Sequence, residues 1–328
     1  MRIGVHLRHW EGSPHDIASL AKLAEDVGLE SVWVSETWGS DATALAAWIA
    51  AHTSTIAIGT GVLQIPARTP AAAAMAALTL DHLSGGRLRF GLGVSGPLVV
   101  EGWHGVSFGS PLVRTREYVT LVRAMLDRRE PLALDGEVYT LPVPGGPGKT
   151  MKTNVTPLRA DVPIYLAAMG PKNVALAIEI ADGWLPLLFS PEHVEVFGLP
   201  ALPEGFDVAP MVLTAIDEDL DTARDEVRPH LALYVGAYGS RGQNFYADLV
   251  RRYGFEAEVD RIQEAALDRR MADATAAVSD ELVDALTLVG PVGRVRERAQ
   301  ASAEAGATSL LAMTKDPASI RGMGEVAT

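Results

Sequence analysis

The feature that most constrains the fold of this chain is a regular alternation of short apolar segments with amphipathic runs of helical length. Candidate strands occupy residues 2–7, 31–34, 56–60, 88–93, 162–167, 183–187, 208–215 and 308–313. Candidate helices between them occupy residues 16–27, 41–51, 70–83, 114–127, 171–180 and 295–304. Repeated strand–helix–strand units favour parallel pairing with right-handed crossovers, and eight of them can close on themselves. The pattern predicts the α/β class and a (β/α)8 TIM barrel with insertions, with an open doubly wound sheet as the alternative.

The length of 328 residues suits one such barrel, so a single domain spanning residues 1–328 is expected. Two stretches are longer than the connection between consecutive strands of a barrel requires. Residues 129–161 combine a hairpin-like segment with a Pro/Gly-rich run, and residues 217–286 hold several helical runs. Both are interpreted as insertions in the barrel.

The amino-acid composition excludes several classes of binding partner and of catalytic group. A net charge of −13 argues against nucleic acid, because phosphate binding needs a clustered positive surface. The absence of Cys excludes disulfides, thiolate metal ligands and Cys nucleophiles, and it fits a reducing compartment. The first ten residues pass directly into a strand, and no uncharged apolar run is long enough to span a membrane. We therefore expect a cytoplasmic protein with no membrane partner.

In a (β/α)8 barrel the reacting groups lie on the loops that follow the carboxyl ends of the strands. Glu36 directly follows the strand at 31–34, where its carboxylate could exchange a proton with a bound ring; a solvated loop carboxylate is the alternative. Residues 91–96 are rich in Gly, so the backbone there can approach a ligand closely and offer free amides. They lack the full G-x-G-x-x-G spacing, which argues against a Rossmann site.

A second candidate ligand site lies at residues 169–173, with the sequence Met-Gly-Pro-Lys-Asn. Gly and Pro at the first turn of a helix leave N–H groups unpaired, and these would point toward the barrel mouth. A phosphate cradle and an ordinary helix start are equally consistent with this spacing.

The His and Trp residues divide into structural and functional candidates. His6 and His9 could form a metal pair, but their spacing gives no common face and no third ligand is evident, so no metal is expected. Three Trp residues within apolar elements are expected in the core: Trp33, Trp48 and Trp184. Three others fall in predicted mouth loops, where an aromatic ring could stack on a flat ligand: Trp10, Trp38 and Trp103.

Several segments, in this order along nearly the whole chain, resemble the luciferase-like family, specifically its branch of F420-dependent oxidoreductases. They are residues 21–36, 58–62, 80–87, 91–96, 116–118 and 181–184. The resemblance implies a luciferase-like barrel that binds coenzyme F420 or FMN in its mouth. It also implies a non-proline cis peptide bond at Gly61-Val62, behind the deazaflavin ring, and a phosphate-bearing tail near Ser95 and Gly170.

On this resemblance, the residues expected to bind the cofactor are His6, Thr60, Gly61, Val62, Gly93, Val94, Ser95, Gly96, Ala168, Met169, Gly170 and Pro171. The expected catalytic residues are Glu36, Thr37 and Trp38. Several relatives carry an acidic residue followed by His after the second strand, and here Thr37 replaces that His. Glu36 is thus the acid–base candidate.

The substrate expected from the sequence is a small, apolar or conjugated organic molecule. Clustered Lys and Arg for a second phosphate are not evident in the mouth loops, so a sugar phosphate is not expected. Aromatic residues at Trp10, Trp38, Trp103 and Phe189 are interpreted as substrate contacts.

Three functions stay open at the level of sequence. The first is hydride transfer between F420 and this substrate, in the reductase or dehydrogenase direction. The second is an FMN-dependent monooxygenase that uses dioxygen, and the third is a non-catalytic flavin-binding barrel. Ala-rich helices such as residues 71–80 are compatible with a homodimer or a higher homo-oligomer, as in dimers of this family.

Overall fold

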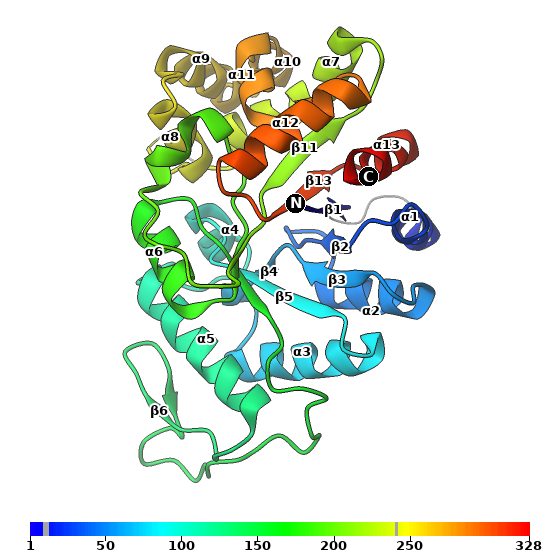
Figure 1. Cartoon of the computed structure of the whole chain (residues 1–328). Coiled ribbons are helices and arrows are strands. Elements are labelled where there is room, and N and C mark those ends of the chain that lie inside the picture. The colour runs from blue at the N-terminus through cyan, green and yellow to red at the C-terminus, as the bar shows by residue number, and fades with distance from the viewer. Residues whose placement is uncertain (9–12, 240–241) are drawn as a thin grey trace.

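A computed structural model describes residues 1–8, 13–239 and 242–328 and shows a ring of parallel strands surrounded by helices (Figure 1). Each strand of the ring pairs with the next in parallel register, and β13 pairs with β1. The strands in order are β1 (Arg2–His6), β2 (Ser31–Val34), β3 (Ala57–Thr60), β5 (Leu88–Gly93), β8 (Ile164–Ala167), β9 (Gly183–Trp184), β10 (Asp207–Val208) followed by β11 (Met211–Ala215), and β13 (Ser309–Met313).

The ring closes through β10 and β11, which the sequence predicts as one strand. β10 pairs with β9, and β11 pairs with β13. Only Ala209 and Pro210 separate the two strands, and Leu187 forms a bridge to Met211 across this gap. Pro210 has no N–H to donate, which interrupts the ladder without opening the ring. The predicted (β/α)8 barrel is thus confirmed, with β4 (Leu63–Gln64) and β12 (Leu288–Val289) as short additional strands.

Helices cover the outside of the ring. They are α1 (Pro14–Asp26), α2 (Ala42–His52), α3 (Pro70–Ser84), α5 (Pro111–Asp127), α6 (Pro171–Ile180), α12 (Val292–Glu304) and α13 (Pro317–Ala327). The side chains of Ser13, Asp41 and Thr69 accept hydrogen bonds from backbone N–H groups in the first turns of α1, α2 and α3. These caps explain why the helices begin there. None of the helices among the described residues combines the length and apolarity that crossing a membrane requires.

Two long segments interrupt the alternation. The first contains a small antiparallel hairpin of β6 (Leu134–Asp135) and β7 (Thr140–Leu141). The second lies between β11 and β12 and forms a helical group beside the ring (Figure 1). It consists of α7 (Leu220–Ala232), the π-helix η3 (Leu233–Ala237), α8 (Phe245–Arg252), α9 (Glu256–Leu267), α10 (Met271–Ala276) and α11 (Asp280–Leu286).

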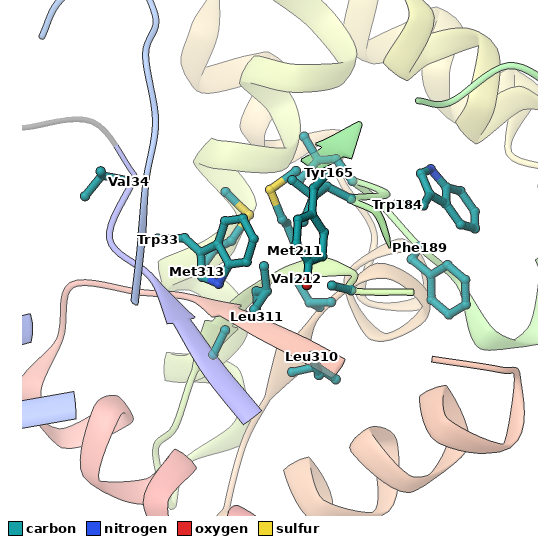
Figure 2. Packing of buried hydrophobic residues seen from close by; sticks show 14 of the residues in the cluster. Trp33, Val34, Tyr165, Trp184, Phe189, Met211, Val212, Leu310, Leu311 and Met313 are labelled. Carbon is teal, nitrogen blue, oxygen red and sulfur yellow. The ribbon is translucent and has the colours of Figure 1, made fainter. Parts of the chain in front are cut away.

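Large aromatic side chains fill the interior of the ring. Trp33 and Tyr165 meet edge to face, with ring centroids 5.2 Å apart, and Met211 and Met313 lie beside them (Figure 2). Gly59 leaves room for this filling, because a Cβ there would lie 2.1 Å from the Trp33 indole. Core positions for Trp33 and Trp184 are confirmed.

Trp48 is not a core residue, contrary to the sequence prediction. Its side chain is 37% exposed on the outer face of α2. Its indole N–H donates to the carbonyl of Pro14, and its ring lies against His52. Trp48 therefore joins α1 to α2 from outside the core.

Candidate active site

A cavity of about 650 Å³ lies at the carboxyl ends of the strands and is the natural ligand site of this barrel. Every predicted site residue except Thr60 lines it. Those residues are His6, Glu36, Thr37, Trp38, Gly61, Val62, Gly93, Val94, Ser95, Gly96, Ala168, Met169, Gly170 and Pro171. Residues from β1, the β2–α2 loop, the loops after β3, β5 and β8, and the helical group thus meet at one place.

Thr60 lies beneath the cavity instead of lining it. Its hydroxyl donates to the carbonyl of Gly91 at 2.8 Å and accepts from the Gly91 N–H at 2.9 Å. The side chain is fully buried. Thr60 therefore joins β3 to β5 and is not among the residues that line the cavity, so its direct binding of the cofactor stays a prediction.

Glu36 is held in an ion pair with Arg68. One carboxylate oxygen accepts from Arg68 Nη1 at 2.8 Å and from the Gln64 N–H at 3.0 Å. The other accepts from Arg68 Nη2 at 2.5 Å and from the Ala42 N–H at 3.3 Å. The Glu36 side chain is only 5% exposed. A proton could reach it only if these bonds broke, so the geometry favours a positioning role over the acid–base role expected from the sequence.

Arg68 is a residue that the sequence reasoning missed. It follows the short helix η1 (Ile65–Ala67), after the loop taken as part of the barrel mouth. It also pairs with Asp41 at the start of α2. The sequence contained one indication of Arg68: a carboxylate buried at a barrel mouth, such as that of Glu36, needs a cation nearby.

His6 fixes the backbone at the rear of the cavity. Its Nδ1 accepts from the Arg8 N–H at 3.1 Å, so its Nε2 carries the proton that is donated to the Gly61 carbonyl at 2.7 Å. The Gly61-Val62 peptide bond is cis, as the resemblance implied. A Cβ at Gly61 would lie 2.8 Å from the His6 ring, so Gly is required at this contact.

The other end of the cavity offers backbone amides and one cation. Gly170 caps α6 without any side-chain hydrogen bond, and Pro171 occupies the first turn. Ser95, at φ 60°, and Gly96 follow β5 and face the same space. Lys172 lines this end and forms no ion pair within residues 1–8, 13–239 and 242–328. Free N–H groups, a helix start and an ammonium group suit a phosphate.

Three tyrosines from the helical group complete the wall: Tyr234 of η3, Tyr238 directly after η3, and Tyr246 of α8. Their place at the barrel mouth was not predicted from the sequence, because no local pattern shows where an insertion folds back. Tyr234 and Tyr238 are four residues apart, which is the spacing of one helical face and the only sequence signal for this wall.

Two other aromatic residues that the sequence placed at the barrel mouth are not found among the described residues that line the cavity. Trp103 is exposed outside the cavity lining, and Phe189 is buried against Trp184 and Phe197, so the interpretation of both as substrate contacts is wrong. His9 and Trp10 lie outside the described residues. Within the described part of the chain no group of three or more His, Asp or Glu side chains is placed to hold a metal ion.

The sequence is similar to known oxidoreductases over most of its length. It is 43% identical to the protein named "Putative coenzyme F420-dependent oxidoreductase Rv3520c" of Mycobacterium tuberculosis, covering 95% of this chain and 94% of that protein. It is 27% identical to a 5,10-methylenetetrahydromethanopterin reductase of Archaeoglobus fulgidus, covering 91% of this chain and 89% of that protein.

The fold also matches that of a solved structure. The coenzyme F420-dependent tetrahydromethanopterin reductase of Methanopyrus kandleri superposes with a TM-score of 0.84 at 23% identity, covering 99% of this chain and 98% of that one. The model of the luciferase-like monooxygenase family matches residues 1–309. With that match and the close relative above, the chain belongs to the luciferase-like monooxygenase family.

Proposed function

We propose that this protein is a coenzyme F420-dependent oxidoreductase that transfers a hydride between the deazaflavin and a small organic substrate. The observation that carries the proposal is the cavity itself. It has a rear formed by Gly61 and Val62 at a cis peptide bond and a phosphate-compatible end at Lys172. The 43% identical relative is named for the same cofactor.

The residues present fit the cofactor. Its ring system would lie against Gly61 and Val62, and its phosphate would approach Ser95, Gly170 and Lys172. The deazaflavin supplies a ring carbon that gives or accepts a hydride, and it lacks the flavin nitrogen that helps to activate dioxygen. The protein binds and orients the ring, and its apolar walls exclude water from the hydride path.

Two groups of this chain hold the rear of the site in place. His6 binds the Gly61 carbonyl, and the Glu36–Arg68 pair binds the Gln64 N–H at the end of the same loop. Both anchors act on the backbone that would contact the ring. We therefore propose that Glu36 orients the cofactor pocket through Arg68 and Gln64 instead of transferring a proton.

Titration of the purified apoprotein with F420 and with FMN tests the cofactor. F420 is expected to bind at least about tenfold more tightly than FMN, because the 43% identical relative is named for F420. The Gly93→Ala variant should lose most of its F420 affinity, since a Cβ at Gly93 would lie 2.6 Å from Val62 Cγ2 and displace it. Fluorescence quenching or calorimetry measures both effects.

The matched control is Gly102→Ala, because a Cβ at Gly102 would have no described atom within 4 Å apart from its chain neighbours and the backbone of its own helix. That variant should bind F420 as the wild type does. Tight FMN binding without F420 binding would contradict the proposal and favour an FMN-dependent monooxygenase. Binding of F420 with no turnover of any alcohol or carbonyl compound would favour the non-catalytic barrel.

We also propose that the protein is a cytoplasmic homodimer. The cysteine-free sequence supports this location, since it needs no oxidising compartment. The outer faces of α2 and α3 form a shallow apolar depression around Ala47, with Met75 and Leu83 exposed beside it. Exposed large apolar side chains that cluster in this way are typical of a subunit interface.

The Met75→Glu variant should therefore shift the protein from dimer to monomer, because it would bury a charge in the interface. Light scattering after size-exclusion chromatography measures the mass. Met151→Glu is the control, since Met151 is at least as exposed as Met75 but lies in the segment between α5 and β8. A monomeric wild type at micromolar concentration would exclude the dimer.

A further inference from the structure

The helical group places three phenols on one wall of the cavity. The ring centroids of Tyr234 and Tyr238 are 5.0 Å apart, those of Tyr234 and Tyr246 are 5.2 Å apart, and those of Tyr238 and Tyr246 are 5.7 Å apart. All three residues line the cavity. They form a compact set, which we call the tyrosine wall.

The hydroxyls of the tyrosine wall are free to bind a ligand. None of them has a hydrogen-bond partner among residues 1–8, 13–239 and 242–328. Burial raises the pKa of Tyr234, Tyr238 and Tyr246 above the ordinary value, so each phenol keeps its proton at neutral pH. A protonated phenol in an apolar cavity has an unsatisfied O–H donor, so a ligand that offers an oxygen acceptor binds there most favourably.

The wall is held rigidly by one buried residue, Asn244. Its amide nitrogen donates to the carbonyls of Tyr234 and Val235, at 3.1 and 2.9 Å. Its amide oxygen accepts from the N–H groups of Tyr246 and Ala247, at 3.0 and 3.1 Å. One side chain thus ties η3 to the start of α8. The tyrosines are positioned before any ligand enters, which lowers the entropic cost of binding.

The surroundings of the tyrosine wall are aromatic. Trp38 lies against Tyr238 with ring centroids 5.5 Å apart, and Phe108 lies against Phe245 at 6.3 Å. Each pair joins the helical group to a loop of the barrel. Flat aromatic surfaces of this kind favour a ligand that contains a ring.

Among the described residues that line the cavity, no carboxylate or ammonium group stands free beside the tyrosine wall. Of the ionisable carboxyl and ammonium groups that line the described cavity, Glu36 is paired with Arg68, and Lys172 stands at the start of α6. Arg8 acts on Tyr234 and Tyr238 from outside the lining, and its guanidinium contacts His230. Its positive charge makes the phenols stronger donors toward an oxygen acceptor.

We propose that the tyrosine wall is the substrate site, and that it binds the oxygen of a neutral, ring-bearing ketone or of the matching secondary alcohol. This inference rests on the proposed F420-dependent function. In the reductive direction the carbonyl carbon receives a hydride from the reduced deazaflavin, and the carbonyl oxygen receives a proton from a phenol of the wall. The phenol regains a proton from water and the ring nitrogen of the deazaflavin gives up its proton to water, so ketone and reduced deazaflavin together give the alcohol and the oxidised deazaflavin.

Acetophenone is a suitable probe, with 1-phenylethanol as the probe for the reverse direction. The wild type should bind acetophenone saturably in calorimetry and should reduce it with reduced F420. Each single variant, Tyr234→Phe, Tyr238→Phe and Tyr246→Phe, should weaken binding about fivefold, and the triple variant at least about tenfold. F420 affinity is measured on the same variants, so that a change in cofactor binding is separated from a change in acetophenone binding.

Tyr139→Phe is the matched control, since Tyr139 packs outside the cavity lining and should not affect acetophenone binding. Thermal melting checks that every variant folds. The proposal is overturned if acetophenone fails to bind the wild type, if the triple variant binds it as well as Tyr139→Phe does, or if benzoate binds more tightly than acetophenone. Failure of the wild type to bind F420 would instead overturn the proposed function. Acetophenone binding to the apoprotein would still test whether the tyrosine wall is a binding site.

Discussion

Replacing Arg68 by Met is expected to lower the free energy of unfolding by about 3 kcal/mol and to weaken F420 binding strongly. The variant would leave the Glu36 carboxylate almost fully buried without its cation. Glu36 would then turn toward water or take up a proton, and it would release the N–H groups of Gln64 and Ala42. Chemical denaturation and F420 titration measure the two losses separately.

A double-mutant cycle sharpens this test. Glu36→Gln combined with Arg68→Met should be more stable than Arg68→Met alone, because no buried charge is left unpaired. Arg129→Met is the control, since the Arg129 side chain is 83% exposed and its one ion pair among the described residues is with Asp127. Arg129→Met should change the free energy of unfolding by less than about 0.5 kcal/mol. If Arg68→Met proved as harmless as Arg129→Met, the anchoring role of the pair would be wrong.

The second large effect concerns Glu25, which holds the turn before β3. One of its carboxylate oxygens accepts from the N–H groups of Ser54, Thr55 and Ile56, at 2.7, 2.6 and 3.1 Å. Burial opposes ionisation of Glu25, but these hydrogen bonds and the one from Lys22 outweigh it and hold its pKa far below the ordinary 4.5. Glu25→Gln should therefore cost about 2 kcal/mol of stability at pH 7.

The sign of the pH dependence follows from the lowered pKa. The unfolded chain takes up the proton first as the pH falls below about 4.5, so the stabilisation from Glu25 is complete above that pH and declines below it. The wild type should lose stability between pH 5 and pH 2 more steeply than Glu25→Gln, as urea denaturation across this range would show. Glu130→Gln, at an exposed position, should show the same pH dependence of stability as the wild type. Parallel pH profiles for wild type and Glu25→Gln would refute the assignment.

Much of the barrel and of its cavity was predictable because both follow from local order in the chain. Strands at 31–34 and 88–93 and the helix at 171–180 occur where the sequence predicts them. A parallel barrel brings the carboxyl ends of its strands to one end, so residues that follow strands, such as Glu36 and Gly93, had to meet there.

The chemistry of the site was less predictable because it depends on contacts between distant segments. Thr60 lies directly before Gly61, yet its hydroxyl is used by Gly91 and it is not among the residues that line the cavity. Phe189 follows a strand as Trp38 does, yet it packs into the core with Phe197. Position in the chain predicts which loop a side chain belongs to, and packing decides which way that side chain points.

The sequence by itself determined the alternation of strands and helices, the helix starts, and the set of loops from which the cavity is built. Hydrophobic periodicity, capping residues and glycine positions act over a few residues, and they can be read from the chain. Only the tertiary structure decided that Arg68 neutralises Glu36 and that the tyrosine wall of the helical group covers the barrel mouth. These contacts join residues about 30 to 200 positions apart, and no local pattern encodes which distant partner will satisfy a buried charge or line a shared cavity.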